Sequence, residues 1–114
     1  NRMEIFYEHN AALIAIPQVD LIKFNVKTGD TEGLVNFPLS IKGIKLAAAV
    51  IDRGDERKSS FRRKGGFDVN TCARKYFNGG GDFNAAGGKN TETLDEVVLK
   101  FKAALKENEE KLNS

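Results

Sequence analysis

The sequence predicts a single α/β domain over residues 1–114, in which a mixed β-sheet of about four or five strands packs against helices. Two apolar runs of strand length, residues 11–16 and 46–51, indicate buried strands, because such runs are typical of strands covered on both faces. Two later segments, which follow Asp68 and Thr93, have apolar residues at helical spacing. A chain of 114 residues suits one buried core and is short for two.

The segment after the first strand predicts two short helices. Pro17 ends the strand at residues 11–16, and residues 19–24 place their apolar side chains toward one side of a helix. Thr28-Gly29-Asp30 is a turn signal. We expect a second helix over residues 31–36, ending just before Pro38, because proline disfavours helical geometry in the residue that precedes it.

Residues 46–63 predict an antiparallel β-hairpin. The apolar strand at residues 46–51 is followed by Arg53-Gly54-Asp55-Glu56, a tight turn, and then by a second strand over residues 57–63.

The C-terminal half predicts two amphipathic helices. Asp68 is placed to cap the first, whose apolar face is formed by Val69, Cys72, Ala73, Tyr76 and Phe77. Thr93 and Glu96 form a capping-box pattern at the start of the second. The tail after Lys106 loses the apolar stripe, and we expect it to fray.

Between these helices, residues 78–88 contain five glycines in eleven positions, a density that neither a helix nor a strand interior favours. We therefore expect a loop. One interpretation is functional, because consecutive glycine amides can converge on an anion such as a phosphate oxygen. The other is structural, with Gly79 as a helix C-cap and the remainder as a mobile connection.

Composition excludes several classes of function. The 18 basic and 16 acidic residues nearly cancel, so a phosphate-binding patch must be local. His9 is the single histidine and Cys72 the single cysteine, which argues against a self-contained metallohydrolase and predicts no catalytic or metal-ligating residue here. No apolar stretch approaches membrane-spanning length, so we expect a soluble, cytoplasmic protein. Because the chain begins at Asn1, we expect a fragment of a longer protein.

The helix, the glycine triplet, one polar residue and then Asn84-Ala85-Ala86-Gly87-Gly88 together resemble the signature of the DHH-associated domain. Residues 31–41 and the strand motif Ser60-Phe61-Arg62 are similar to the bacterial nanoRNase (bifunctional oligoribonuclease) and adenosine-bisphosphate (pAp) phosphatase members. Phe67-Asp68-Val69-Asn70 also fits the family's entry to the helix, and the resemblance covers residues 2–105.

The resemblance implies that catalysis and substrate binding belong to two different domains. An N-terminal Asp-His-His domain of the same parent chain holds manganese ions and activates water, while this domain closes over the substrate and carries no cofactor of its own. The implied partners are short RNA or DNA oligonucleotides or nucleotide phosphates, and the parent protein is a possible homodimer. Carried over by position, Arg62 pairs with the substrate phosphate and Gly79, Gly80 and Gly81 approach it with backbone amides. The implied substrate site also includes Ser60, Asp82 and Asn84, of which Asn84 fixes the loop or touches the nucleotide.

Asp82 departs from the family pattern, which normally has histidine after the glycine triplet. A carboxylate about 4 Å from a phosphate charge repels it by roughly 1 kcal/mol at the dielectric of water, so Asp82 should weaken phosphate binding. Three explanations stay open: a natural change that accepts hydrogen bonds from a base, a degenerate paralogue, or a deliberate substitution that weakens turnover.

The leading functional prediction is the substrate-binding domain of a manganese-dependent phosphoesterase that hydrolyses short oligoribonucleotides or nucleoside bisphosphates. The alternative is a non-catalytic nucleic-acid-binding module like the tail domain of alanyl-tRNA synthetases, although the net charge of +2 argues against a large duplex-binding surface. A third interpretation is an interaction domain in which the glycine segment binds nothing.

Overall fold

The computed structural model describes residues 3–23, 28–64, 68–81 and 85–113. Its strands are β1 (Met3–Phe6), β2 (Ala11–Ile16), β3 (Leu46–Asp52), β4 (Arg57–Arg63), β5 (Gly80–Gly81) and β6 (Ala85–Asn90). Its helices are α1 (Gln18–Lys23), α2 (Thr28–Leu39), α3 (Val69–Tyr76), α4 (Leu94–Glu107) and α5 (Glu109–Leu112), with a 3-10 turn at Tyr7–His9.

The strands form one mixed sheet in the order β1-β2-β3-β4-β6-β5. Strands β2 and β3 are parallel, and each other neighbouring pair is antiparallel. This arrangement confirms the predicted α/β class with a mixed sheet, and its six strands exceed the four or five expected from the sequence.

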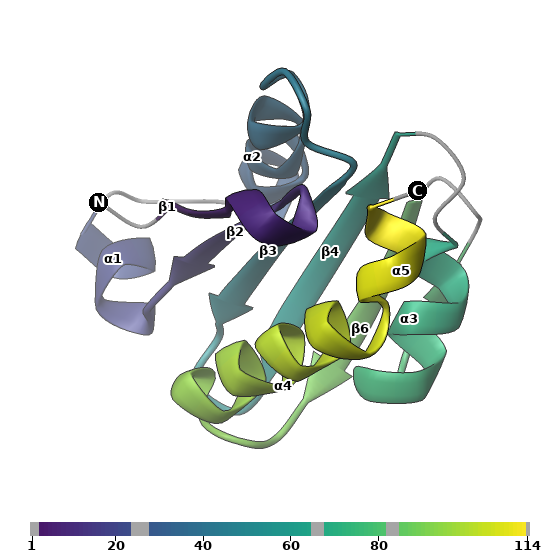
Figure 1. Cartoon of the computed structure of the whole chain (residues 1–114). Coiled ribbons are helices and arrows are strands. Elements are labelled where there is room, and N and C mark those ends of the chain that lie inside the picture. The colour runs from purple at the N-terminus through teal and green to yellow at the C-terminus, as the bar shows by residue number, and fades with distance from the viewer. Residues whose placement is uncertain (1–2, 24–27, 65–67, 82–84, 114) are drawn as a thin grey trace.

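Helices cover the two faces of the sheet unequally. Helices α3, α4 and α5 lie on one face, in front of the strands in Figure 1, while α1 and α2 lie behind them. Helix α2 packs against β2, β3 and β4. The part of the rear face formed by β4, β6 and β5 is where two surface pockets are found.

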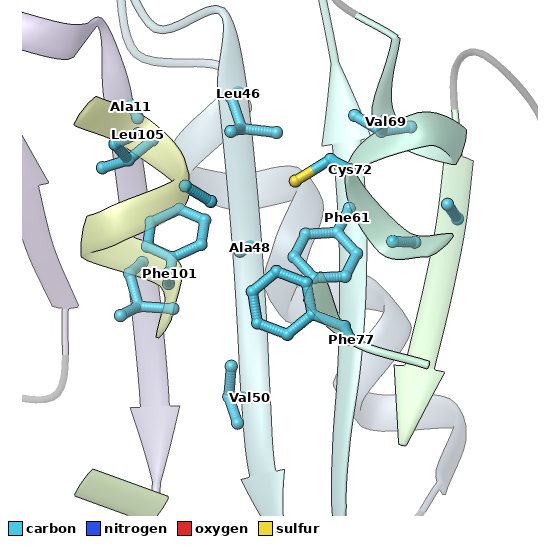
Figure 2. Close-up of a cluster of buried hydrophobic side chains, with 14 of the residues drawn as sticks. Ala11, Leu46, Ala48, Val50, Phe61, Val69, Cys72, Phe77, Phe101 and Leu105 are labelled. Carbon is cyan, nitrogen blue, oxygen red and sulfur yellow. The ribbon is translucent and has the colours of Figure 1, made fainter. Parts of the chain in front are cut away.

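The larger core lies between the sheet and helices α3, α4 and α5. The rings of Phe61 in β4 and Phe77 after α3 are fully buried, with centroids 4.8 Å apart and planes tilted by 45° (Figure 2). Tilted aromatic pairs at this separation are favourable beyond the area they bury. Because Phe77 ends α3, this contact fixes where the chain enters the glycine segment.

A smaller core lies on the other face, where α1 and α2 meet β2 and β3. Its strand residues alternate with those of the larger core, as the two-residue period of a strand requires. Its buried members are Ile14, Ile16, Leu21, Val35, Ala47, Ala49 and Ile51.

The predicted caps and hairpin are confirmed. Oδ1 of Asp68 accepts hydrogen bonds from the amides of Asn70 and Thr71, at 2.9 and 3.2 Å. Thr93 and Glu96 form both bonds of the capping box. The β3–β4 turn closes with Arg53 N donating to Glu56 O at 2.8 Å, and Gly54 takes a φ of +96°.

Helix α2 is longer than predicted. It begins at Thr28, so Thr28-Gly29-Asp30 forms a first helical turn instead of a separate turn, and it runs to Leu39. Pro38 lies in the last turn and the helix ends one residue later, as expected near a residue that has no N–H to donate to the preceding turn. Helix α1 begins one residue before the predicted range, and the predicted last residue, Phe24, lies outside the described residues.

Two further expectations were wrong. The tail after Lys106 does not fray, because it completes α4 and forms α5, whose Leu112 is fully buried and whose Leu112 carbonyl accepts a hydrogen bond from the Asn10 side chain at 3.0 Å. The glycine-rich segment is not only a loop, because it contains β5 and most of β6.

Candidate functional site

Ser60 and Arg62 point to the rear face of the sheet. Residues of β4 alternate between buried and half-buried up to Arg62, with Phe61 in the larger core and Ser60 and Arg62 half-buried. Arg62 lies opposite Ala47 of β3 and Ala85 of β6. Since side chains at every second position share a face, Ser60 and Arg62 lie side by side among small neighbours.

These two residues and the glycine segment form a pocket of about 280 Å³. Its described lining comes from three neighbouring strands and consists of Ser60, Arg62, Gly80, Gly81, Ala85, Ala86 and Gly87. The structure thus brings four of the predicted site residues together. Gly79 lines a second pocket beside the first, which shares Ser60, Gly80 and Gly87 with it.

The Arg62 guanidinium is the single charged group in the described lining of the smaller pocket. Its Nη1 donates a hydrogen bond to the carbonyl of Phe61 at 2.9 Å, which holds the side chain close to its own strand. A guanidinium has five N–H donors in a planar fork, so further donors are available for an anion such as phosphate.

The amides of Gly79 and Gly81 already have partners within the chain. Gly79 N donates to the carbonyl of Ala73 at 3.0 Å, and Gly81 N donates to Oδ1 of Asn70 at 3.1 Å. An amide contact from either glycine to a phosphate stays a prediction, and it requires the ligand to share or replace one of these bonds.

Packing of the main chain also explains why some of these positions are glycine. A Cβ on Gly79 would lie 1.8 Å from the carbonyl oxygen of Gly87, and one on Gly88 would lie 2.4 Å from that of Phe77. The segment after α3 can approach β6 closely because Gly79 and Gly88 have no side chains that would separate the two main-chain segments. Gly79 is not the residue that reverses the chain after the helix, because Asn78 takes the left-handed conformation with a φ of 53°.

Asp82 and Asn84 lie outside the described residues. In the chain they stand between Gly81 and Ala85, both of which line the smaller pocket. Their roles as site residues stay predictions.

Asn70 contacts the glycine segment, a role that the sequence did not predict. The residue belongs to the first turn of α3, where Asp68 caps the helix, and its side chain accepts the Gly81 amide. The sequence signal was present in the Asp68-Val69-Asn70 motif, but only the tertiary contact between α3 and β5 shows what Asn70 holds.

His9 and Cys72 lie away from this pocket. His9 Nε2 is 3.9 Å from a carboxylate oxygen of Glu109 in α5. Cys72 is buried in the larger core, and burial raises the pKa of its thiol to about 12, so it is a poor nucleophile there. Within the described ranges, no group of three or more histidine, cysteine, aspartate or glutamate side chains is placed to hold a metal ion.

The described structure is thus a mixed sheet flanked by helices, with an arginine and a glycine-lined pocket on the part of its rear face formed by β4, β6 and β5. Residues 11–112 match the DHHA1 domain, and the chain belongs to this family.

Solved structures give particular relatives. An exopolyphosphatase-related protein from Bacteroides fragilis is 37% identical, with a TM-score of 0.94, and the match covers 98% of this chain and 33% of that protein. A pGpG-specific phosphodiesterase from Vibrio cholerae (10% identity, TM-score 0.60, 92% and 34% covered) shares the fold. So does the C-Ala domain of Aquifex aeolicus alanyl-tRNA synthetase (16% identity, TM-score 0.58, 92% and 98% covered). The chain thus spans about a third of the length of the first of these relatives.

No curated protein gives a significant match. Within the described residues, no helix has both the length and the apolar composition that crossing a membrane requires.

Proposed function

We propose that this chain is the substrate-binding domain of a manganese-dependent phosphoesterase that hydrolyses short oligoribonucleotides or nucleoside bisphosphates. The observation that carries this proposal is the pocket in which Arg62 and Ser60 lie beside Gly80 and Gly81. The hydrolytic chemistry belongs to a separate Asp-His-His domain of the same protein.

The pocket suits a phosphate group. Arg62 offers a charged fork of donors that matches phosphate oxygens, and hydrogen bonds of this kind are stronger than those between neutral groups. The Ser60 hydroxyl adds a donor beside it, and the absence of side chains at Gly80 and Gly87 lets a ligand approach the backbone.

The 37% identical relative supports the division of labour. The match covers nearly all of this chain but only 33% of the exopolyphosphatase-related protein, so that protein has room for a catalytic domain outside the matched region. The name of that protein relates it to enzymes that act on an anionic phosphate polymer, which agrees with the positive charge of the Arg62 pocket.

Manganese does not fit the described residues of this chain. Its preferred ligands are carboxylate and imidazole groups that converge on one point, and the described residues provide no such group. We therefore place the metal in the accompanying domain and derive no step through it here.

The alternative is a non-catalytic nucleic-acid-binding module of the alanyl-tRNA synthetase type. The C-Ala relative is 16% identical, against 37% for the exopolyphosphatase-related protein, so the sequence is nearer to the second. The phosphoesterase proposal is preferred for that reason.

Isothermal titration of the chain with adenosine 5′-monophosphate tests the binding role. Arg62→Gln keeps the aliphatic stem but removes the charge, and we expect the affinity to fall by roughly ten- to a hundred-fold, because a hydrogen bond to a charged group contributes about 1.5–3 kcal/mol. Lys102→Gln, on α4, is the matched control for loss of one positive charge. Equal affinity for Arg62→Gln and the control, with unchanged thermal unfolding, removes Arg62 from the site.

Hydrolysis is tested in the full-length protein that contains this chain. We expect manganese-dependent release of mononucleotides from dinucleotides to pentanucleotides, or of phosphate from nucleoside bisphosphates, and a loss of that activity in Arg62→Gln. Binding of RNA without hydrolysis favours the module of the alanyl-tRNA synthetase type instead.

A further inference from the structure

The Arg62 pocket continues into a larger one along β4. This second pocket has a volume of about 380 Å³ and shares Ser60, Gly80 and Gly87 with the first. Its described lining is Ile51, Arg53, Lys58, Ser59, Ser60, Asn78, Gly79, Gly80, Gly87, Gly88 and Lys89. The two pockets together form one groove, with Ser60 at its middle.

The far end of the groove is positively charged. Lys58 lies two residues before Ser60 on the same face of β4, and the strand register places it directly opposite Lys89 of β6. Arg53, from the β3–β4 turn, lines the same pocket, whose described lining contains no carboxylate. Three cations thus meet at this end.

The facing lysines are unfavourable for the sheet by themselves. Like charges directly opposite each other on neighbouring strands destabilise the pair. Neither Lys58 nor Lys89 forms an ion pair with a carboxylate of the described residues, whereas Arg57 on the opposite face of β4 pairs with Asp52 at 3.1 Å. An anionic ligand would relieve this repulsion.

We propose that Lys58 and Lys89 form a second phosphate subsite, and that the ligand is a short single-stranded oligonucleotide that runs along β4 from Arg62 past Ser60. Four residues of extended strand separate Arg62 from Lys58 by roughly 13 Å, so a ligand that reaches both ends carries more than one phosphate. The described lining of the groove contains no aromatic side chain for base stacking, so backbone phosphates supply the contacts.

This inference rests on the proposed function and extends it. A nucleoside monophosphate fills only the Arg62 end of the groove. A trinucleotide fills both ends, and its affinity then depends on Lys58 and Lys89.

The test compares adenosine 5′-monophosphate with the trinucleotide pApApA by titration of the chain at several salt concentrations. In the double variant Lys58→Gln/Lys89→Gln we expect trinucleotide affinity to fall about ten-fold or more, because each lost contact is a bond to a charged group. The slope of log affinity against log salt should also decrease by roughly 0.7, since the subsite holds one phosphate and each phosphate contact on a single strand contributes about 0.7. Monophosphate affinity should stay within about two-fold of the unaltered chain, because the monophosphate reaches only Arg62.

The double variant Lys102→Gln/Lys106→Gln removes the same charge from α4, on the other face of the sheet, and is the matched control. If both double variants lose trinucleotide affinity equally, the second subsite is overturned while the Arg62 site stands. If the unaltered chain binds neither ligand, the proposed function and this subsite are overturned together. Circular dichroism melting checks that each variant is folded.

Discussion

The amide of Gly81 donates a hydrogen bond to Oδ1 of Asn70 at 3.1 Å, and this bond ties β5 to the first turn of α3. The same helix turn is capped by Asp68, whose carboxylate accepts bonds from two amides and from the Thr71 hydroxyl. The glycine segment that lines the candidate site is therefore held from the opposite face of the sheet, by a helix that does not line it.

Asn70→Ala should lower the free energy of unfolding by about 1 kcal/mol, the usual contribution of one such bond, and should weaken monophosphate binding because β5 is less well held. Asn70→Asp keeps an acceptor for the Gly81 amide and should regain the stability, while its negative charge keeps binding weak. Urea unfolding and calorimetry measure the two effects. Unaltered stability in Asn70→Ala would mean that the bond does not hold β5.

Gly79→Ala should destabilise the chain by at least about 2 kcal/mol, because its Cβ has no room beside the carbonyl of Gly87 and the strands must separate. Gly33→Ala is the control. Gly33 lies in α2, and a Cβ added there would meet nothing within 4 Å, so alanine should stabilise the helix by about 0.5–1 kcal/mol. Thermal unfolding of both variants gives the comparison, and the opposite order of stability would contradict it.

Glu92 should make stability depend on pH in the acid range. A hydrogen bond from Lys100, then one from Asn90, lowers the pKa of Glu92 from 4.5 to about 2. Because the folded state holds this carboxylate ionised more tightly than the unfolded state does, its contribution is complete above pH 4.5 and declines as the pH falls toward 2. The stability gap between the unaltered chain and Glu92→Gln should therefore narrow over that range in urea titrations. Glu110→Gln, on α5, is the charge-matched control, and a constant gap for Glu92→Gln would refute the assignment.

Asp82→His should tighten monophosphate binding several-fold, because it removes a repulsion of roughly 1 kcal/mol at 4 Å in water. Asp82→Asn, which removes the charge without adding an imidazole donor, separates the two causes. This prediction depends on the position of Asp82 directly after Gly81 in the chain. Equal or weaker affinity for both variants in calorimetry speaks against a place for Asp82 near the phosphate.

Much of the fold was predictable because its signals are local. Asp68 and Thr93 stand at the start of apolar stripes with helical spacing, and both act as caps in the structure. The strand at residues 46–51 is apolar throughout, and helices cover both of its faces. In each case a few neighbouring residues contain the whole signal.

The glycine segment was not predictable in the same way. Its composition disfavours strands, yet β5 and β6 form there. Glycine is needed at positions 79 and 88 because main-chain atoms occupy the space that a Cβ would take. This close contact between main-chain segments arises only when the fold places the end of α3 beside β6, so no local sequence pattern reveals it. Strand β1 was missed for a similar reason, since Met3–Phe6 is a short edge strand and only its pairing with β2 defines it.

The site was predictable in its residues but not in its extent. The family resemblance predicted Arg62 and the glycines as site residues. The pairing of Arg62 with Ala85 across β4 and β6 places Arg62 beside the glycine segment. The pairing of Lys58 with Lys89 lies outside every motif, because two residues 31 positions apart become neighbours only through that same register.

The two cores differ in size, so the helices on the two sides of the sheet should unfold locally at different rates. Helices α1 and α2 are held by the smaller group of buried side chains, while α3, α4 and α5 share the larger one. Amide protons of α2 should therefore exchange with deuterated solvent well before those of α4, through fluctuations that leave the rest of the molecule intact.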